Sequence, residues 1–189
     1  MGIAKINNIF SPEELDLIIN ITPTDEDMID ENLGRILLYS VISSLTKEMK
    51  NKLYAIVSNI SDVPLMIDHA LCVEYSSKYG KPNLPPHFDG DTNNLIVNMQ
   101  ISSNISWDLG INLETYKLED NSAIIFNANT EIHWRVHKEF QEGEYVRMLF
   151  VRFYDPQNRP DYSYLPNNQI HEVFKEAREL RDNLQKISG

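Results

Sequence analysis

The segment Leu84-Pro85-Pro86-His87-Phe88-Asp89-Gly90-Asp91-Thr92 decides how this sequence is interpreted, because it places one histidine and two aspartates between prolines and a glycine. Asp89, Asp91 and Asn93 alternate as in a calcium-binding loop. Such a loop needs glycine at its sixth position and glutamate at its twelfth, where this chain has asparagine and glutamine. An acidic turn and a transition-metal site through His87 and Asp89 therefore stay as the interpretations to test.

The length and charge of the chain narrow its function class. A chain of 189 residues suits one domain with a substantial core. A net charge of -11 argues against binding nucleic acid or an anionic membrane surface. No apolar run is long enough to span a bilayer, and residues 1–10 lack the pattern of a signal peptide. The one cysteine, Cys72, excludes an internal disulfide, so we expect a cytoplasmic, reduced protein in which ferrous iron can persist.

The hydrophobic pattern changes its period along the chain. Ser11-Pro12-Glu13-Glu14 is typical of a capping box, and three- and four-residue spacing predicts a second helix over 33–59. Short alternating or apolar runs between 63 and 154 predict antiparallel strands. We predict one mainly β domain, 1–189, of the α+β class: helical support (1–62), a sandwich or barrel core (63–156), and a loop with a C-terminal helix (157–189).

The transition-metal interpretation needs a third ligand. Two histidines and one carboxylate can hold ferrous iron while leaving coordination positions open. Residues two apart on a strand point to the same face, so His87 and Asp89 can reach one ion. His133 and His137 lie four apart in the later segment 132–137, and one of them is enough to complete the site.

The order Tyr75…His87-Phe88-Asp89…Phe126…His133…Arg147 resembles the non-haem iron(II), 2-oxoglutarate-dependent oxygenases, and within them the prolyl 4-hydroxylase-like branch. The opening segment 6–15 is similar to the short strand and capped helix that begin that branch. The strand that ends at Phe126, seven residues before His133, is similar to the strand before the family's distal histidine. This spacing favours His133 as the third ligand, with His137 as the alternative.

The resemblance implies a double-stranded β-helix (jelly-roll) core, an Fe(II) cofactor, 2-oxoglutarate as co-substrate, O2, and support by ascorbate. It implies that Arg147 binds the far carboxylate of 2-oxoglutarate and that Tyr75 also contacts the co-substrate. Asn98, on the next strand, is a further candidate contact, although the sequence does not show which face of the strand it occupies. Guanidinium suits a carboxylate because it donates two parallel hydrogen bonds. Arg152 has the opposite parity on the strand 145–153, so we expect it to face outward. The interval of fourteen residues from His133 to Arg147, against ten from His137, leaves the ligand choice open.

The implied activity is a dioxygenase that hydroxylates an aliphatic C–H bond, of a prolyl residue or another amino-acid side chain, and releases succinate and CO2. The substrate is then a small molecule or a peptide, with Trp134 and Asp91 as candidate contacts and an acidic surface that would suit a cationic substrate. The sequence permits a homodimer. The alternatives are a non-catalytic jelly-roll protein that binds a metal or ligand, and a cupin-type metalloenzyme that does not use 2-oxoglutarate.

Overall fold

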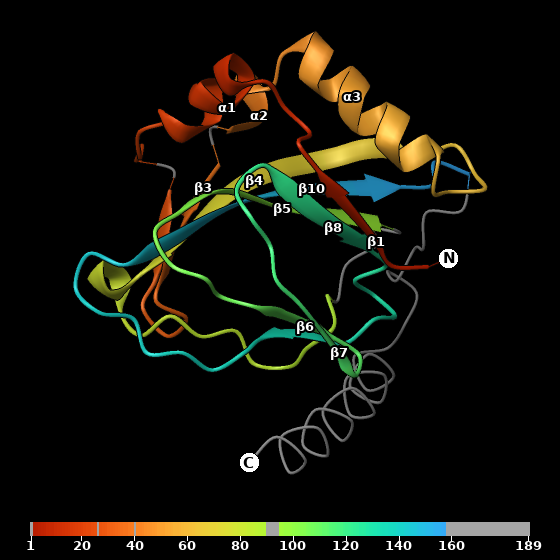
Figure 1. Cartoon of the computed structure of the whole chain (residues 1–189). Helices are drawn as coiled ribbons and strands as arrows, with labels where there is room; N and C mark the ends of the chain where they lie inside the picture. Colours follow the sequence, from red (N-terminus) through yellow and green to blue (C-terminus); the bar gives the residue numbers. More distant parts are fainter. Residues whose placement is uncertain (1, 26, 40, 90–94, 158–189) are drawn as a thin grey trace, which may run out of the picture.

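The computed structural model describes residues 2–25, 27–39, 41–89 and 95–157 (Figure 1). Asp91 and the predicted C-terminal helix lie outside these residues. Among the described residues, no helix has the length and apolar composition needed to cross a bilayer. The elements in chain order are β1 (Ala4–Asn7), α1 (Pro12–Ile19), β2 (Met28–Asp30), β3 (Arg35–Leu38), α2 (Val41–Ser44), α3 (Lys47–Ser58), β4 (Met66–Ser76), a 3-10 turn η1 (Ser77–Tyr79), β5 (Leu95–Ser103), β6 (Leu109–Ile111), β7 (Glu114–Tyr116), β8 (Ser122–Phe126), β9 (His133–Arg135) and β10 (Tyr145–Tyr154).

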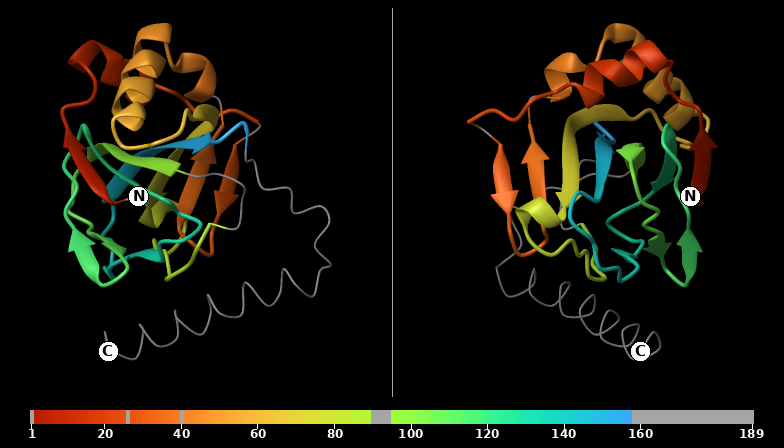
Figure 2. Two further views of the ribbon diagram at one scale, coloured as in Figure 1. Left: turned by 90° about the vertical axis from the view of Figure 1, so that its right-hand side faces the viewer. Right: turned by 60° about the vertical axis from the view of Figure 1, so that its left-hand side comes forward.

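Two antiparallel sheets form the core. The larger has seven strands in the order β1-β8-β5-β10-β4-β3-β2, and the smaller has three in the order β7-β6-β9. Helices α1, α2 and α3 cover the outer face of the large sheet, and the small sheet lies on the opposite side (Figures 1 and 2). The order of neighbours is non-consecutive, as expected when a chain alternates between the two sheets of a jelly roll. The predicted fold class is confirmed.

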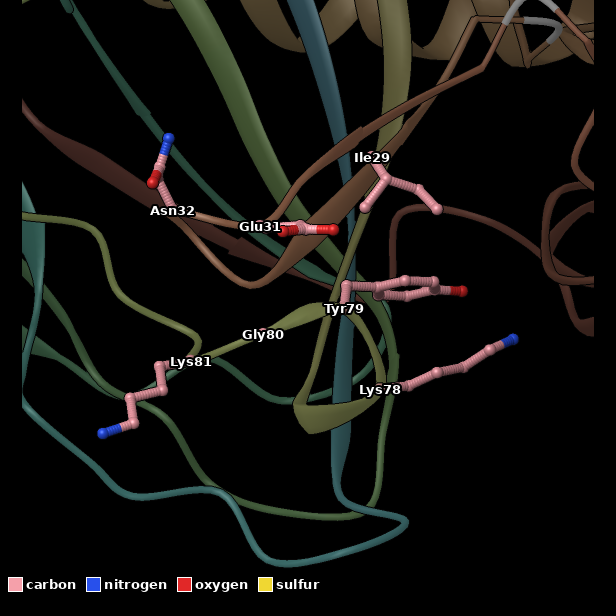
Figure 3. A pocket seen from close by; sticks show the side chains of 7 residues that line it. All are labelled: Ile29, Glu31, Asn32, Lys78, Tyr79, Gly80 and Lys81. Carbon is pink, nitrogen blue, oxygen red and sulfur yellow. The ribbon is translucent and has the colours of Figure 1, made fainter.

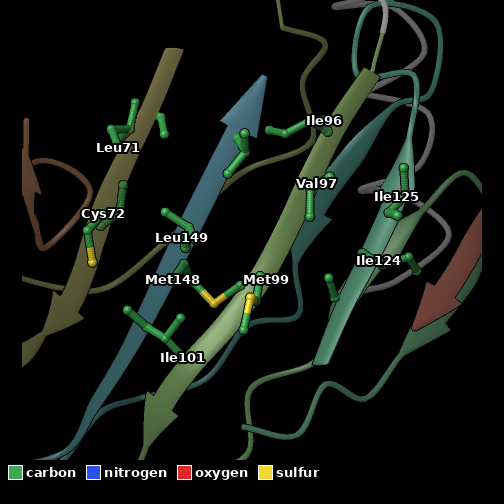
Figure 4. Close-up of a cluster of buried hydrophobic side chains, with 14 of the residues drawn as sticks. Leu71, Cys72, Ile96, Val97, Met99, Ile101, Ile124, Ile125, Met148 and Leu149 are labelled. Atoms are coloured by element: carbon green, nitrogen blue, oxygen red, sulfur yellow. The ribbon is translucent and has the colours of Figure 1, made fainter. Parts of the chain in front are cut away.

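Strand β10 lies at the centre of the large sheet, between β4 and β5. Leu149 pairs with Cys72 on β4 and with Met99 on β5, and none of these three side chains is exposed to solvent. Apolar side chains project from neighbouring strands throughout this region (Figure 4). Because helices cover one face of the sheet and the small sheet covers the other, both faces of β10 are buried, as in strands that read as continuous apolar runs.

The N-terminal helix begins as predicted. The Ser11 hydroxyl accepts a hydrogen bond from the Glu14 backbone N–H at 3.3 Å, and the Glu14 carboxylate accepts one from the Ser11 N–H at 2.7 Å. Two of the unsatisfied N–H groups of the first turn are thereby paired. Strand β1, just before this helix, joins the edge of the large sheet beside β8, so the short strand and the capped helix are both confirmed.

The prediction of one helix over 33–59 is wrong in its first half. Residues 35–38 form β3, which pairs with β4, and the long helix α3 begins only at Lys47. The reason lies in Gly34, whose φ of +57° places it in the turn between β2 and β3. A Cβ there would lie 2.3 Å from the Pro82 backbone nitrogen. The consequence for the site is that β3 carries Arg35 to the interior side of the sheet, where it lines a cavity.

Candidate metal centre

The structure brings His87, Asp89 and His133 together. The backbones of the two histidines exchange N–H to carbonyl hydrogen bonds of 3.0 Å in both directions, and the Asp89 N–H donates to the Ala128 carbonyl at 2.8 Å. The Asp89 Oδ1 atom lies 3.6 Å from His87 Nε2 and 3.7 Å from His133 Nε2. One ligand atom from each residue falls within 4.8 Å of the others, so a single ion can contact all three.

Backbone carbonyls fix the orientation of both imidazoles. His87 Nδ1 lies 2.8 Å from the Pro85 oxygen, and His133 Nδ1 lies 3.1 Å from the Glu131 oxygen. A carbonyl can only accept a hydrogen bond, so Nδ1 carries the proton in each ring and Nε2 presents its lone pair to the centre. A second hydrogen bond of this kind is what holds metal-binding histidines in the correct tautomer. The donor set therefore fits a divalent transition metal.

The electrostatics of the triad favour the protonation states that a metal needs. Burial alone would raise the pKa of Asp89, but hydrogen bonding to His87 and the charges of Arg152 and His133 lower it to about 2. Burial lowers the pKa of His133 to about 4. At neutral pH the aspartate is therefore charged and His133 is neutral, which are the metal-binding forms.

The other two residues proposed around His133 lie elsewhere. His137 is exposed and does not belong to the cluster. Trp134 has the opposite parity to His133 on β9, and its indole packs on Gly110, where a Cβ would come within 2.2 Å of the ring. Gly110 therefore makes room for the indole, and Trp134 does not line the cavity described next.

The triad opens into a cavity of about 300 Å³ between the two sheets. Tyr75 and Asn98, both predicted as co-substrate contacts, line this cavity. The Oδ1 atom of Asn98 is buried and has no hydrogen-bond partner among the described residues. A buried acceptor without a partner indicates a place for a ligand or an ordered water. The remaining lining residues are Leu33, Arg35, Leu37, Leu71, Val73, Leu84, Pro85, His87, Asp89, Ile96, His133, Phe150 and Arg152.

The predicted orientation of Arg147 and Arg152 is wrong. Arg147 lies on the helix-covered face of the large sheet, where its guanidinium pairs with Glu74 and donates to the Ile19 carbonyl at 2.5 Å. Arg152 instead lines the cavity, and its Nη2 lies 3.1 Å from Asp89 Oδ2. Both faces of β10 are buried, so the apolar pattern of the strand did not distinguish the face toward the cavity from the face toward the helices.

A second interior arginine, Arg135, was missed from the sequence. It lies two residues beyond His133 on β9 and is 3% exposed. Its guanidinium donates to the Trp107 carbonyl, lies 5.2 Å from the centre of the Trp107 ring, and has Nη2 3.1 Å from Met148 Sδ. Among the described residues it has no ion pair. Burial lowers its pKa to about 10, so it stays charged at neutral pH. The signal in the sequence was its parity with His133.

Tyr75 connects this buried cation with another arginine. Arg35 Nη1 lies 3.4 Å from the Tyr75 hydroxyl, and its Nη2 lies 3.1 Å from Asp30. The Tyr75 ring also packs edge-on against the Trp107 ring, over which the Arg135 guanidinium lies. The phenol therefore lies near two guanidinium groups. Of these, Arg135 has no carboxylate within ion-pair distance among the described residues, although the charge of Asp108 is near enough to favour its charged form.

A second hollow, of about 590 Å³, lies where the β2–β3 turn meets η1 (Figure 3). Lys78 and Lys81 extend away from each other there, and the Lys78 ammonium lies 5.2 Å from the centre of the Tyr79 ring (Figure 3). The described residues that line it include one carboxylate, Glu31, and no histidine. The described lining of this hollow lacks the donors of a transition-metal site, so the interior cavity is the better candidate for a functional site.

Comparisons with known proteins bear on the fold. No family model matches the sequence, and neither does any curated protein. Solved structures do match. A prolyl hydroxylase from Trichoplax adhaerens, in complex with a hypoxia inducible factor peptide, is 11% identical with a TM-score of 0.58, covering 84% of this chain and 86% of that one.

Two more solved structures match to the same degree. A 2-oxoglutarate-Fe(II) oxygenase family oxidoreductase from Burkholderia pseudomallei is 9% identical with a TM-score of 0.58, over 81% of this chain and 85% of that one. The α-ketoglutarate-dependent epimerase SnoN of nogalamycin biosynthesis is also 9% identical with a TM-score of 0.58, over 82% and 78%. The chain therefore has the fold of the 2-oxoglutarate- and iron-dependent oxygenases, including the prolyl hydroxylases.

Proposed function

We propose that this protein is an Fe(II)- and 2-oxoglutarate-dependent dioxygenase that hydroxylates an aliphatic C–H bond. The observation that carries the proposal is the set of three donors, His87 Nε2, Asp89 Oδ1 and His133 Nε2, facing one point at the wall of an interior cavity. The same cavity holds the buried Asn98 acceptor, which has no partner in the described part of the chain. The fold supports this proposal, since its solved neighbours include oxygenases of this kind.

In this proposal Arg135, which lies near the lining residue Tyr75 but outside the cavity lining itself, replaces Arg147 as the anchor for the far carboxylate of 2-oxoglutarate. Residues two apart on a strand are about 6–7 Å apart along it, and His133 and Arg135 share the interior face of β9. That span suits a five-carbon dicarboxylate whose keto-acid end lies at the triad. A buried cation without an ion pair is costly to maintain, and a carboxylate from the co-substrate would offset this cost.

The chain's own residues then have separate tasks. Arg152 pairs with Asp89 Oδ2 and leaves Oδ1 toward the two imidazoles, so Asp89 would hold the ion through Oδ1. Tyr75 and Arg135 orient the co-substrate, while Leu71, Ile96 and other apolar wall residues exclude water. The bound iron and 2-oxoglutarate supply the oxidation of R–H by O2 to R–OH, with 2-oxoglutarate converted to succinate and CO2.

The test measures succinate formed from 2-oxoglutarate by the protein loaded with Fe(II), with ascorbate, alone and with candidate substrates. Hydroxylation predicts succinate release that His87→Ala abolishes together with metal affinity. Arg147→Gln, on the other face of the sheet, is the control and should leave both intact. Metal binding without 2-oxoglutarate binding would favour a cupin-type metalloenzyme. Binding of both without succinate would favour a non-catalytic jelly-roll protein.

The finer parts of the proposal concern substrate and setting. The prolyl hydroxylase among the fold neighbours supports an amino-acid side chain, prolyl or other, as the hydroxylated group. A reduced cytoplasmic setting is part of the proposal because it keeps iron ferrous. Cys72 is compatible with a reducing or an oxidising setting, since its side chain is fully buried.

A further inference from the structure

We propose that the substrate of this site presents a free carboxylate with an N–H donor on the adjacent carbon, as in a free α-amino acid or the last residue of a peptide. Arg152 binds the carboxylate and Asn98 Oδ1 accepts the N–H. This inference rests on the proposed function, and it excludes a residue in the interior of a peptide.

The first half of the recognition site is Arg152. Its side chain is 17% exposed, lines the cavity and contacts Asp89 at 3.1 Å. A guanidinium carries five N–H donors in a planar fork, so one cation can hold Asp89 and also receive a second carboxylate. Two of its neighbours in the cavity wall are apolar. Ile96 is its direct pairing partner on β5, and Phe150 lies two residues before it on β10. An apolar surround strengthens a charge-assisted hydrogen bond.

The second half is Asn98. It is 3% exposed, lines the same cavity, and its buried Oδ1 has no partner among the described residues. An unsatisfied buried amide oxygen is unfavourable by the full cost of its lost hydration, so the site is built for a donor. The co-substrate has no N–H group, and its carboxylates are acceptors. Asn98 Oδ1 is therefore better matched to the substrate than to 2-oxoglutarate.

The two groups are neighbours across the sheet. Asn98 pairs directly with Phe150, and Arg152 lies two residues further along β10 on the same face. Diagonal neighbours of this kind are about 7–8 Å apart at their backbones, close enough for both side chains to contact one small polar group. Arg152 lies at the Asp89 end of the cavity, so a substrate held there places its side chain beside the triad.

Charge separates this recognition site from the co-substrate anchor. Asp30 already pairs with Arg35, and Asp89 already pairs with Arg152. Arg135 has no such partner among the described residues and takes the far carboxylate of 2-oxoglutarate in the proposed function. When a divalent ion binds Asp89, the charge of that carboxylate is shared with the metal. The guanidinium of Arg152 then lies beside a partly neutralised carboxylate, which makes the substrate end of the cavity more favourable for a second anion.

The first test changes the ligand and leaves the protein intact. Wild-type protein with Fe(II) and 2-oxoglutarate is assayed for succinate with the common free L-amino acids, with their carboxamides and methyl esters, and with peptides bearing a free or an amidated C-terminus. We expect at least one free acid to stimulate succinate release and its amide and ester to do so about 10- to 100-fold less, the range for a lost hydrogen bond to a charged group. A preference for the free amino acid or for the peptide with a free C-terminus identifies which kind of molecule supplies the carboxylate. Equal stimulation by acid and amide overturns the inference.

The second test uses Asn98→Leu, of similar volume, with Arg147→Gln as the control. Binding of 2-oxoglutarate to the protein loaded with Ni(II) is measured beside substrate stimulation. We expect Asn98→Leu to raise the KM of the active amino acid about tenfold and to leave the Kd of 2-oxoglutarate unchanged. Weaker 2-oxoglutarate binding with an unchanged substrate KM would assign Asn98 to the co-substrate and overturn the inference. If wild type binds no 2-oxoglutarate, the proposed function itself has failed, which is a different result.

Discussion

Replacing Arg135 by methionine separates stability from co-substrate binding. Burial lowers the pKa of this guanidinium from 12.5 to about 10, which corresponds to about 3 kcal/mol by which the interior disfavours the charged form. Against this, the variant loses the hydrogen bond to the Trp107 carbonyl, about 1 kcal/mol, and the contact with the Trp107 ring, about 0.5–1 kcal/mol. The ligand-free Arg135→Met protein should therefore be as stable as wild type or up to about 2 kcal/mol more stable.

The same change should weaken 2-oxoglutarate binding. A hydrogen bond to a charged group contributes about 1.5–3 kcal/mol, so the Kd of 2-oxoglutarate for the protein loaded with Ni(II) should rise about 10- to 100-fold. Urea unfolding of the metal-free protein measures the stability, and calorimetric titration measures the Kd. A gain in stability with a loss of ligand affinity is the pattern expected of a residue kept for function.

Arg147→Met is the matched control, because Arg147 on β10 is another arginine of the core sheets but pairs with Glu74 and the Ile19 carbonyl. Removing it leaves Glu74 half-buried without its cation, so this variant should be destabilised by about 1–3 kcal/mol and bind 2-oxoglutarate normally. The reasoning is refuted if Arg135→Met loses more than about 2 kcal/mol of stability while its Kd for 2-oxoglutarate stays at the wild-type value.

Three further predictions concern stability and reactivity. Burial raises the pKa of Cys72 to about 12, so its thiol should resist a thiol reagent at pH 8 in the native protein and react at once in urea; fast native reaction would contradict its packing. Burial lowers the pKa of His133 from 6.5 to about 4, so between these pH values only the unfolded chain binds a proton at this residue. The free energy of unfolding of the metal-free protein should therefore fall by up to about 3 kcal/mol as the pH falls from 6.5 to 4. Urea unfolding of His133→Gln should show a weaker dependence of this free energy on pH. Gly34→Ala would force a Cβ to 2.3 Å from the Pro82 nitrogen at a φ of +57°, so we expect a loss of roughly 2–4 kcal/mol; an unchanged melting temperature would show that the turn can relax.

The cluster of His87, Asp89 and His133 could be predicted from the sequence because much of its geometry is local. His87 and Asp89 are two residues apart, and strand parity alone puts them on one face. The prediction of His133 depended on a longer relation, its spacing from Phe126. The structure places His133 beside His87 and Asp89, whereas His137 is exposed and lies outside the cluster. The strands between 63 and 154 were also recognisable, because short apolar runs separated by turn residues are too short for helices and fit extended backbone.

The failures share one physical cause, which is burial on two sides. In β10 every position alternates between two covered faces, so hydrophobicity was no guide to which face contains Arg147 and which contains Arg152. In 33–44, the apolar residues satisfied a helical period and an extended one equally well. The left-handed backbone at Gly34 resolved that choice, and the fit of this glycine against Pro82 comes from a contact far along the chain.

The proposed function also gives a reason why a fixed interval from His133 is a weak guide to the co-substrate anchor. Binding the far carboxylate requires a guanidinium at the right position between the two sheets, and an arginine on more than one strand can reach this position. Met148 faces the interior from β10, and the Arg135 guanidinium reaches it from β9, to within 3.1 Å of its sulfur. A methionine on β10 and an arginine on β9 thus meet in the interior of the domain, the region toward which Arg147 was expected to face. In the proposed function, the parity of Arg135 with His133 places the co-substrate anchor and one metal ligand on the same strand. Their separation is then fixed more directly than by a hairpin of variable length.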